Sequence, residues 1–288
     1  MKVAVGFFDG VHLGHQAILK GADAALTFGN HPLTVLAPER APRLIMTPEE
    51  RVAAIKACGV KDVTVLDFSP ELAEMDPEEF ANSFLKRKGF RSPTVRCGQN
   101  WRFGKGGMGD ADFLRRRGID VEVAPYVEHR GERISSSRIR ACLERGEIED
   151  ANAMLGRRYE VRGMREEGKG LGRKLGYPTI NFSLEKQDLR LPHGVYEVEA
   201  EGTHGIANYG LAPTMGELAW RKPVLEVHLL HPSSLIPHPS SLIPHPSSPI
   251  PHPPSLISFV RFIRPERKFD SVEDLQRQIA LDCAKIGV

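Results

Sequence analysis

The chain of 288 residues carries 39 basic and 37 acidic side chains, a balance that argues against binding polyanions by charge alone. Its 41% of hydrophobic residues excludes disorder throughout, because that share is sufficient to build packed cores. No apolar run reaches the roughly 18 residues of a membrane span, and the four cysteines show no CxxC spacing. We therefore expect no membrane or nucleic-acid partner, and a location in the reducing cytoplasm.

The first half of the chain predicts a Rossmann-like α/β domain with a parallel sheet and helices on both faces. Apolar runs rich in β-branched residues alternate there with segments of helical pattern. The expected strands are Lys2–Val5, Ala25–Phe28, Val60–Asp67, Thr94–Gly98 and Asp120–Tyr126. The expected helices are Gln16–Lys20, Thr47–Cys58, Pro77–Lys88, Ala111–Arg117, Ser136–Glu144 and Glu147–Leu155. Only eleven residues separate His15 from Thr27, so the first helix must be short.

After Ala151 the pattern changes to short β-rich runs separated by turns, which predicts a small antiparallel β-barrel or sandwich. The expected strands are Tyr159–Met164, Thr179–Phe182, Val195–Ala200, Gly205–Tyr209, Val224–Leu230 and Leu256–Ile263. A C-terminal helix follows Ser271, which forms a variant of the capping box with Asp274. The predicted domains are residues 1–153 and 154–288.

One segment differs from the rest in composition: residues 231–258 read HPSSLIP, HPSSLIP, HPSSPIP and HPPSLIS. Recurring prolines break helices, so the period of seven is not that of a coiled coil. The Ser/Pro content predicts an inserted, disordered or polyproline-like loop. Doubling the length of a loop costs only about 0.6 kcal/mol, so we expect the fold to tolerate the insertion.

Two histidines follow the first expected strand in GFFDGVHLGH, residues 6–15. Backbone N–H groups at the start of a helix favour anions, and residues three apart lie on one helical face. His12 and His15 can therefore stabilise charge that develops on a phosphoryl group, while Gly10 and Gly14 allow a nucleotide to approach closely. Taken alone, an H-x-x-H pair is also typical of two surface histidines in a turn.

A second pattern that suits phosphates is ISSSRIR, residues 134–140. Its hydroxyls can cap exposed amides at a helix start, and Arg138 and Arg140 can bind phosphate oxygens in pairs. Taken alone, an ordinary serine cap before an amphipathic helix explains this pattern equally well.

These two motifs, with TFGNHP (27–32) and GQNWRFG (98–104), resemble the nucleotidyltransferase half of the bacterial bifunctional riboflavin kinase/FAD synthetase family. The resemblance covers residues 1–150 and implies transfer of AMP from ATP to FMN, giving FAD and pyrophosphate. It implies His12 and His15 as the catalytic residues. The implied ATP-binding residues are Gly6, Phe8, Asp9, Gly10, Gly14, Ser135, Ser136, Ser137, Arg138 and Arg140, and the implied flavin-binding residues are Asn30, His31 and Asn100.

The second half contains the glycine-rich segment GKGLGRKLGYPTIN, residues 168–181. Four glycines within nine residues allow a loop to fold closely over a phosphate chain. Thr179 and Asn181 lie two residues apart on one face of the next strand, and their oxygens suit a Mg²⁺ that keeps most of its water. A basic hairpin turn is the alternative for the loop alone.

A carboxylate interrupts the apolar strand VLEVHLL, residues 224–230. With a period of two, Glu226 and His228 share one face, while Leu225, Val227 and Leu229 point into the core. A glutamate in this setting is either exposed on the surface or a base in a site.

The same half resembles the riboflavin kinase half of that family through the glycine-rich segment, HGVY (193–196), ANYGLAPT (207–214), LEVHLL and RPERKF (264–269). The usual PTAN of the family reads PTIN here. The resemblance implies phosphorylation of riboflavin by ATP, with Glu226 as the general base and Thr179 and Asn181 as ligands of Mg²⁺. The implied ATP-binding residues are Gly168, Gly170, Gly172, Arg173, Gly176, Thr179 and Asn181.

The whole chain is thus expected to be a cytoplasmic, bifunctional transferase that makes FMN and then FAD from riboflavin and ATP, with small molecules as its partners. Two alternatives stay open. One is an adenylyltransferase of the same superfamily that acts on another phosphate acceptor. The other is a protein that binds flavin or nucleotide without turnover.

Overall fold

The computed structural model describes residues 1–85, 93–166, 177–184, 191–211, 223–230 and 254–286. The chain forms two compact units. The first unit consists of Met1–Ile139 with Met154–Gly156, and the second of Arg140–Ala153 with Arg157–Val288. A parallel sheet forms the centre of the first unit, and a closed antiparallel barrel forms the second.

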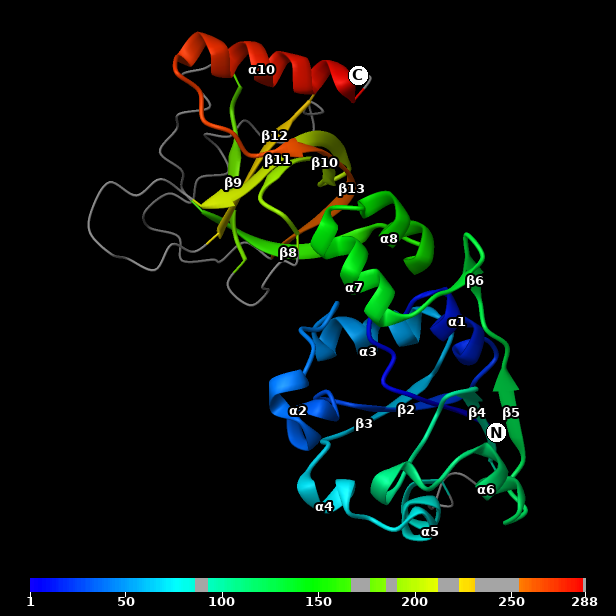
Figure 1. The fold of residues 1–288 in the computed structure, drawn as a ribbon. Helices are drawn as coiled ribbons and strands as arrows, with labels where there is room; N and C mark the ends of the chain where they lie inside the picture. The colour runs from blue at the N-terminus through cyan, green and yellow to red at the C-terminus, as the bar shows by residue number, and fades with distance from the viewer. Residues whose placement is uncertain (86–92, 167–176, 185–190, 212–222, 231–253, 287–288) are drawn as a thin grey trace, which may run out of the picture. The chain divides into compact units, whose positions relative to one another are not determined.

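The sheet of the first unit confirms the predicted Rossmann-like fold (Figure 1). Its strands are β1 (Lys2–Val5), β2 (Ala24–Phe28), β3 (Asp62–Leu66), β4 (Thr94–Gly98) and β5 (Val121–Ala124). They are all parallel, in the order β3-β2-β1-β4-β5. The order reverses beside β1, and ligands of such sheets bind at the carboxyl ends of the strands next to that reversal.

Helices cover both faces of this sheet, as predicted (Figure 1). One face carries α1 (Leu13–Leu19) and α3 (Pro48–Ala57), and the other carries α4 (Pro70–Ala73), α5 (Pro77–Phe80) and α6 (Ala111–Arg115). Successive strand residues alternate between the two cores, so Val3 and Val5 pack with α4 to α6, while Ala4 packs with α1 and α3. Helix α3 begins with a capping box, in which Thr47 and Glu50 bond each other's backbone amides.

Several short elements were not predicted, because each has too few residues to show a period. They are α2 (Leu33–Leu36), α4, the 3₁₀ turns η1 (Pro38–Arg40) and η3 (Lys105–Gly107), and the hairpin of β6 (Glu128–His129) and β7 (Glu132–Arg133). The helix expected over Pro77–Lys88 continues from α5 as a π-helical turn η2, Ala81–Leu85, and residues 86–88 lie outside the described part.

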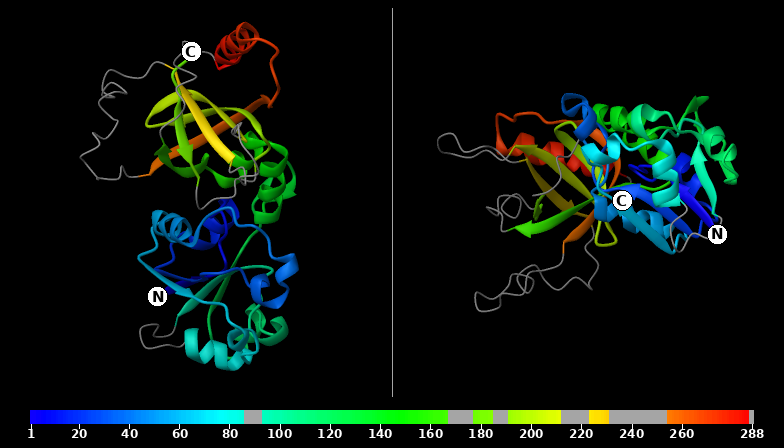
Figure 2. Two further views of the ribbon diagram at one scale, coloured as in Figure 1. Left: turned by 90° about the vertical axis from the view of Figure 1, so that its left-hand side faces the viewer. Right: turned by 90° about the horizontal axis from the view of Figure 1, so that it is seen from below.

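The second unit contains a closed barrel of six antiparallel strands, which confirms the barrel prediction (Figure 2). Its strands are β8 (Tyr159–Glu166), β9 (Ile180–Ser183), β10 (Gly194–Ala200), β11 (Thr203–Leu211), β12 (Pro223–Leu229) and β13 (Ser255–Pro265), in the order β10-β11-β12-β9-β8-β13. Inward-facing Val161, Phe182, Leu225 and Phe259 are completely buried. The alternating pattern therefore set which face of each strand is buried.

The expected strand Leu256–Ile263 is confirmed as part of β13, which begins inside the repeat of residues 231–258. Ser255–Ser258, the last four residues of the repeat, form the start of β13 and pair with β8. Ile257 lies opposite Val161 and is completely buried, so its apolar side chain belongs to the barrel core. Residues 231–253 of the repeat lie outside the described residues.

The remaining helices are α7 (Ser136–Arg145), α8 (Ile148–Leu155) and α10 (Val272–Lys285). Helix α10 belongs to the second unit, whereas α7 and α8 are each divided between the two units. Asn152 of α8 donates to the carbonyl of Phe259 at 2.9 Å and accepts from the amide of Tyr159 at 2.7 Å. The predicted boundary at 153/154 falls inside α8, so the functional limits of the two domains stay a prediction. Among the described helices none is long and apolar enough to cross a membrane.

Candidate active sites

The two predicted catalytic histidines lie together where α1 begins. The helix starts at Leu13 rather than at Gln16, because His12 is its N-cap and accepts from the amide of His15 through Nδ1 at 3.2 Å. The two imidazoles stack with centroids 3.6 Å apart. A Cβ at Gly14 would lie only 3.1 Å from the His12 ring, so glycine permits this stacking. Since Nδ1 of His12 accepts, the ring proton of the neutral form is on Nε2, where it can be donated to a ligand.

The backbone of the loop between β1 and α1 is strained. Phe8 has φ +58°, Val11 has φ +40°, and Gly10 between them has φ +82°. A positive φ is costly for a non-glycine residue and especially for a β-branched one. This loop, which starts at Gly6 directly after β1, is therefore held in an unfavourable shape by its surroundings, as is common at functional sites.

Asp9 fixes the loop against two other segments. Its buried carboxylate accepts from the amide of Ile45 at 2.9 Å, and its carbonyl accepts from Oγ of Ser136 at 2.9 Å. Ser135 accepts from the amide of Arg138 at 3.3 Å and so caps α7. The predicted serines thus hold the start of α7 beside the histidine loop, while Ser137 is exposed.

The two predicted phosphate-binding arginines differ in their surroundings. Arg138 donates to the carbonyls of His129 at 3.0 Å and Glu132 at 2.9 Å, and it also pairs with the carboxylate of Glu132. It is therefore bonded to the β6–β7 hairpin. Arg140 is half-buried and groups with the second unit.

The predicted flavin-binding residues follow the ends of β2 and β4, at the same edge of the sheet as the histidine loop. Asn30 bonds both backbone groups of Phe68, at 2.7 and 2.9 Å, and so connects the ends of β2 and β3. The His31 ring lies edge-on to Phe7, with centroids 4.8 Å apart. Asn100 is exposed after β4 and accepts from the hydroxyl of Tyr126 at 2.5 Å.

Electrostatics keep His15 uncharged. Burial lowers its pKa well below the ordinary value for histidine, and the charges of His12 and Arg51 lower it further. Its Nδ1 is buried, and no group in the described residues bonds it. A neutral imidazole keeps one ring N–H, which can donate a hydrogen bond to an arriving phosphate oxygen.

Arg51 is not among the predicted site residues, although it is 1% exposed and its charge reaches His15. A signal was present: Arg51 is one turn before Ile55, so an arginine occupies the inward face of a helix. An arginine at a core position is rare unless it is paired or functional.

The barrel brings the predicted kinase residues into one row. Glu226 of β12 lies directly opposite Asn181 of β9 on one side and Asn208 of β11 on the other. Directly opposed residues of antiparallel strands project to the same face. The row therefore combines a carboxylate with two carboxamides, and Asn208 is a member that the sequence analysis did not identify as a site residue.

Glu226 is on the outer face of β12, as predicted, with Leu225, Val227 and Leu229 buried on the other face. The residue is exposed, yet the protein atoms around its carboxyl are dense enough that desolvation raises its pKa above the ordinary value. Because the residue is exposed, a substrate can reach its carboxylate. Because its pKa is raised, this carboxylate accepts a proton more readily than an ordinary glutamate does.

Oδ1 of Asn181 is buried and has no hydrogen-bond partner among the described residues. Thr179 is exposed just before β9, and the neighbouring carbonyl of Pro178 lies 2.9 Å from Nδ1 of His228 on β12. The predicted ligand pair is thus placed beside Glu226. The other predicted ATP-binding residues of this half lie outside the described residues: Gly168, Gly170, Gly172, Arg173 and Gly176.

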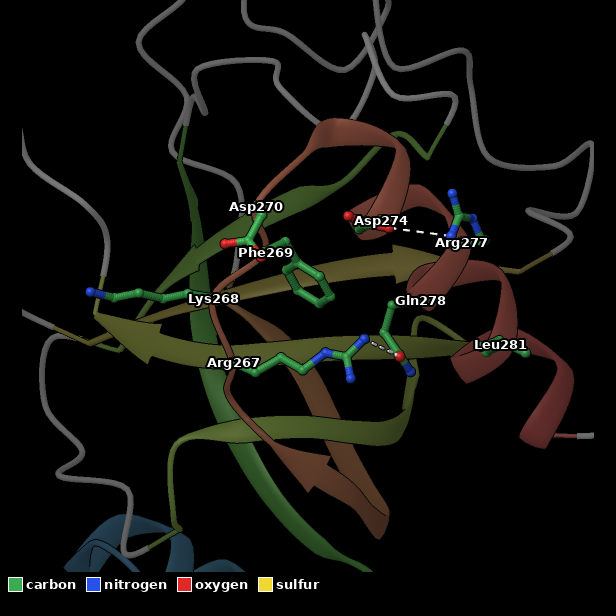
Figure 3. Close-up of a pocket in the computed structure, with 8 residues that line it drawn as sticks. All are labelled: Arg267, Lys268, Phe269, Asp270, Asp274, Arg277, Gln278 and Leu281. Atoms are coloured by element: carbon green, nitrogen blue, oxygen red, sulfur yellow. Dashed lines mark hydrogen bonds and ion pairs between the residues drawn. The ribbon is translucent and has the colours of Figure 1, made fainter.

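A pocket of about 370 Å³ lies between α10 and the segment that connects it to β13 (Figure 3). Arg267 donates to Gln278 at 2.5 Å and lies 4.6 Å from the centroid of the Phe269 ring. Gln278 in turn donates to the buried Asp282 at 2.7 Å. The Phe269 ring therefore lines the pocket beside Arg267, and hydrogen bonds connect Arg267 through Gln278 to Asp282. The motif RPERKF does not by itself predict this pocket.

Comparison with known proteins covers both units. The family model of FAD synthetase matches residues 1–138, and that of riboflavin kinase matches residues 155–287. The bifunctional riboflavin kinase/FMN adenylyltransferase of Bacillus subtilis is 30% identical over 299 residues, which cover 97% of this chain and 89% of the relative. The protein of the same name from Pseudomonas fluorescens is 32% identical over 298 residues, covering 97% and 90%. A crystal structure described as a macrolide-efflux protein from Streptococcus pneumoniae superposes with a TM-score of 0.80 at 27% identity, over 98% of this chain and 92% of that one.

A nucleotidyltransferase unit followed by a barrel-shaped kinase unit defines a two-site, ATP-dependent transferase. The chain belongs to the family of bifunctional riboflavin kinase/FMN adenylyltransferases. It is accordingly an enzyme that phosphorylates riboflavin to FMN and adenylylates FMN to FAD.

Proposed function

We propose that adenylyl transfer takes place at the carboxyl edge of the parallel sheet, beside His12 and His15. An oxygen of the FMN phosphate attacks the α-phosphorus of ATP, the bond from that phosphorus to the bridging oxygen breaks, and pyrophosphate leaves. The imidazoles donate hydrogen bonds to the oxygens that gain charge, and neither becomes covalently attached. The observation that supports this most directly is the stacked, buried histidine pair with the low pKa of His15.

We propose further that the surrounding loop groups bind the two substrates. The strained loop from Gly6 to Gly14 and the hydroxyls of Ser135 to Ser137 face the ATP phosphates. Arg138 and Arg140 contribute positive charge, and Arg138 exchanges its carbonyl partners for phosphate oxygens. Asn30, His31 and Asn100 receive the flavin, since they follow the ends of β2 and β4 at the same edge of the sheet.

For the barrel we propose that Glu226 is the general base of riboflavin phosphorylation. The ribityl hydroxyl oxygen attacks the γ-phosphorus of ATP and its proton passes to Glu226, while the bond to the β-phosphate oxygen breaks and ADP leaves. The support is the place of Glu226 in the row with Asn181 and Asn208, together with its raised pKa.

The donor atoms beside Glu226 fit a Mg²⁺ ion. Oδ1 of Asn181 is a buried acceptor without a partner in the described chain, and the Thr179 hydroxyl is exposed on the same segment. Hard oxygen donors of this kind suit Mg²⁺, which binds few protein groups and shares its shell with phosphates and water. When bound, the ion would neutralise phosphate charge. We propose that the glycine-rich segment binds ATP, and this proposal rests on the sequence alone. Its residues are Gly168, Gly170, Gly172, Arg173 and Gly176.

The substrates of the two proposed reactions indicate where the enzyme acts and which partners it needs. We propose a cytoplasmic enzyme that acts on riboflavin, FMN and ATP and needs no nucleic acid or membrane partner, since its substrates are small soluble molecules.

Incubation of the full chain with ATP, Mg²⁺ and either riboflavin or FMN tests the proposal. Formation of FMN and FAD from riboflavin is the expected result. FAD formed only when FMN is supplied would mean that the barrel lacks kinase activity. No product from either flavin would contradict both assignments and favour a protein that binds without turnover.

A further inference from the structure

Arg51 is a buried cation at the centre of the first unit. Its Nη2 donates to the carbonyl of Phe28 and, at 3.0 Å, to that of Gly29, the two residues where β2 ends. Its guanidinium carbon lies 4.2 Å from the centroid of the Phe7 ring, in the loop that follows β1. A single side chain from α3 therefore contacts the carboxyl ends of two neighbouring strands of the sheet.

The stability of α3 does not account for this arginine. Arg51 lies in the first turn of the helix, where the helix dipole disfavours a cation, and the cap is already formed by Thr47 and Glu50. Its Nε and Nη1 are buried, and no group within the described residues accepts from them. Burying unused donors on a charged group opposes folding, so a purely structural role leaves this arrangement without a reason.

The contacts of Arg51 lead to the residues proposed to act on ATP and FMN. Phe7, which lies against the guanidinium, also packs edge-on against His31. Phe7 and the histidine loop belong to the same strained segment after β1. The charge of Arg51 reaches His15 and is one of the causes that keep that ring neutral.

We propose that Arg51 is a positioning residue for adenylyl transfer: it fixes the loop after β1 against the loop after β2, and so holds the histidine loop in the shape that receives the ATP phosphates. The inference rests on the proposed function of this site. Arg51 itself touches no reacting atom, because it is buried beneath the two loops.

The charged groups around His15 determine the sign of the pH effect. They are His12 at the N-cap of α1 and Arg51 on α3, with the carboxylates of Asp9 and Glu49 facing Arg51. Both Arg51 and a protonated His12 disfavour a second positive charge on His15. Removal of the Arg51 charge therefore raises the pKa of His15 towards its ordinary value, and the acid limb of FAD formation moves to higher pH.

The test compares Arg51→Met and Arg51→Lys with wild type and with Lys56→Met, a matched control that removes an exposed cation from the same helix. Each full-length variant receives FMN, ATP and Mg²⁺, and kcat and KM for FAD formation are measured across a pH series. NMR titration reports the His15 ring directly. FMN formation from riboflavin, which uses the other unit, and the melting temperature show whether each variant is folded.

We expect Arg51→Met to lower kcat/KM for FAD formation by roughly 10²-fold, as for other small misplacements of reacting groups, and to move its acid limb and the His15 titration upward. Arg51→Lys should keep the wild-type titration, because the charge remains, but recover only part of kcat, because an ammonium cannot reproduce the planar fork. Lys56→Met should match wild type in every measurement.

An Arg51→Met enzyme with wild-type kinetics and His15 titration would overturn the inference while leaving the proposed function intact. If Arg51→Met fails to fold, Arg51→Lys decides: a His15 titration displaced upward despite the retained charge overturns the inference. A wild-type chain that forms no FAD from FMN would overturn the proposed function and this inference with it.

Discussion

The two units hold their proposed catalytic groups in different ways. In the first unit, His12 caps α1 and His15 lies in its first turn, at one edge of a parallel sheet, and His12 is only 4% exposed. In the second unit, Glu226 lies on the exposed outer face of an antiparallel barrel strand. Desolvation favours the uncharged form in both places, lowering the pKa of His15 and raising that of Glu226.

The architecture explains this contrast. A parallel sheet directs the carboxyl ends of its strands to one edge, so segments that are distant in sequence meet there and bury one another. An antiparallel barrel brings site residues together by register, as Glu226 and Asn181 show, and leaves one face of each strand open. The first arrangement suits a site that must hold two nucleotides, and the second suits a base that must be reached by a substrate hydroxyl.

The units also differ in how they hold a buried charge. Within the part of the chain that the structure describes, Arg51 donates to two carbonyls, lies over an aromatic ring and retains two unused donors. The buried Asp282 instead accepts from Arg264 at 2.8 Å and from Gln278 at 2.7 Å. The fully bonded Asp282 fits a structural role in attaching α10 to β13. The incompletely bonded Arg51 fits a role in a functional site.

The sharpest test of two independent sites is Glu226→Ala. Without a base for the ribityl proton, FMN formation should fall by up to about 10⁴-fold. Conversion of supplied FMN to FAD should continue at the wild-type rate, because it uses the other unit. Chromatographic separation of the flavin products measures both reactions, and Glu160→Gln on an exposed strand position provides a matched control. Loss of both activities would contradict the separation of the sites.

The reverse pattern is expected for His12→Ala. Loss of one donor to the developing phosphate charge should lower kcat for FAD formation by roughly 10² to 10³-fold. Loss of the cap of α1 should also cost about 1 kcal/mol of stability, measured by denaturant unfolding. FMN formation from riboflavin is the internal control, and a fall in that rate equal to the fall in FAD formation would show that the change acts through folding.

Removal of the fully bonded ion tests the contrast between the buried charges. Asp282→Ala leaves Arg264 without its carboxylate in a nearly buried position and should lower the free energy of unfolding of the barrel by about 3 to 5 kcal/mol. Lys285→Ala removes an exposed partner 3.8 Å from the same carboxylate and should cost less than about 1 kcal/mol. Denaturant unfolding of both variants measures the difference, and equal effects would mean that burial does not control the strength of the pairing.

The pH dependence of the two reactions should differ by a smaller effect, because the pKa of Glu226 is raised and that of His15 is lowered. A base must be ionised, so the raised pKa of Glu226 should reduce FMN formation at a higher pH than an ordinary glutamate, whose pKa is about 4.3, would. The lowered pKa of His15 keeps that ring neutral below the ordinary histidine value of about 6.5. As the pH falls, FMN formation should therefore decline already above the ordinary glutamate pKa, whereas FAD formation from FMN should persist below the ordinary histidine pKa, as initial rates at each pH would show. FMN formation that persists down to the ordinary glutamate value, or FAD formation that is lost at the ordinary histidine value, would contradict the electrostatic contrast.

Much of the fold could be predicted from the sequence, because the information was periodic. Apolar runs rich in β-branched residues identified the strands of the parallel sheet and of the barrel, and proline and serine marked several of the helix starts. The repeat and the expected strand Leu256–Ile263 overlap in the sequence, and the structure shows that Ser255–Ser258 belong to β13. The residues LIS fit both the seven-residue repeat and the start of a β-strand, so the composition alone does not show where the repeat ends.

The sequence by itself determined the order of elements, the outward face of Glu226 and the motifs that indicate phosphate chemistry, because these depend on spacing along the chain. Tertiary structure decided that His12 and His15 stack, that Arg138 bonds the β6–β7 hairpin, and that Asn208 joins Glu226 in one row. It also decided that Arg51 is buried between two strand ends. These outcomes depend on strand register and on packing between distant segments, and no local pattern carries that information.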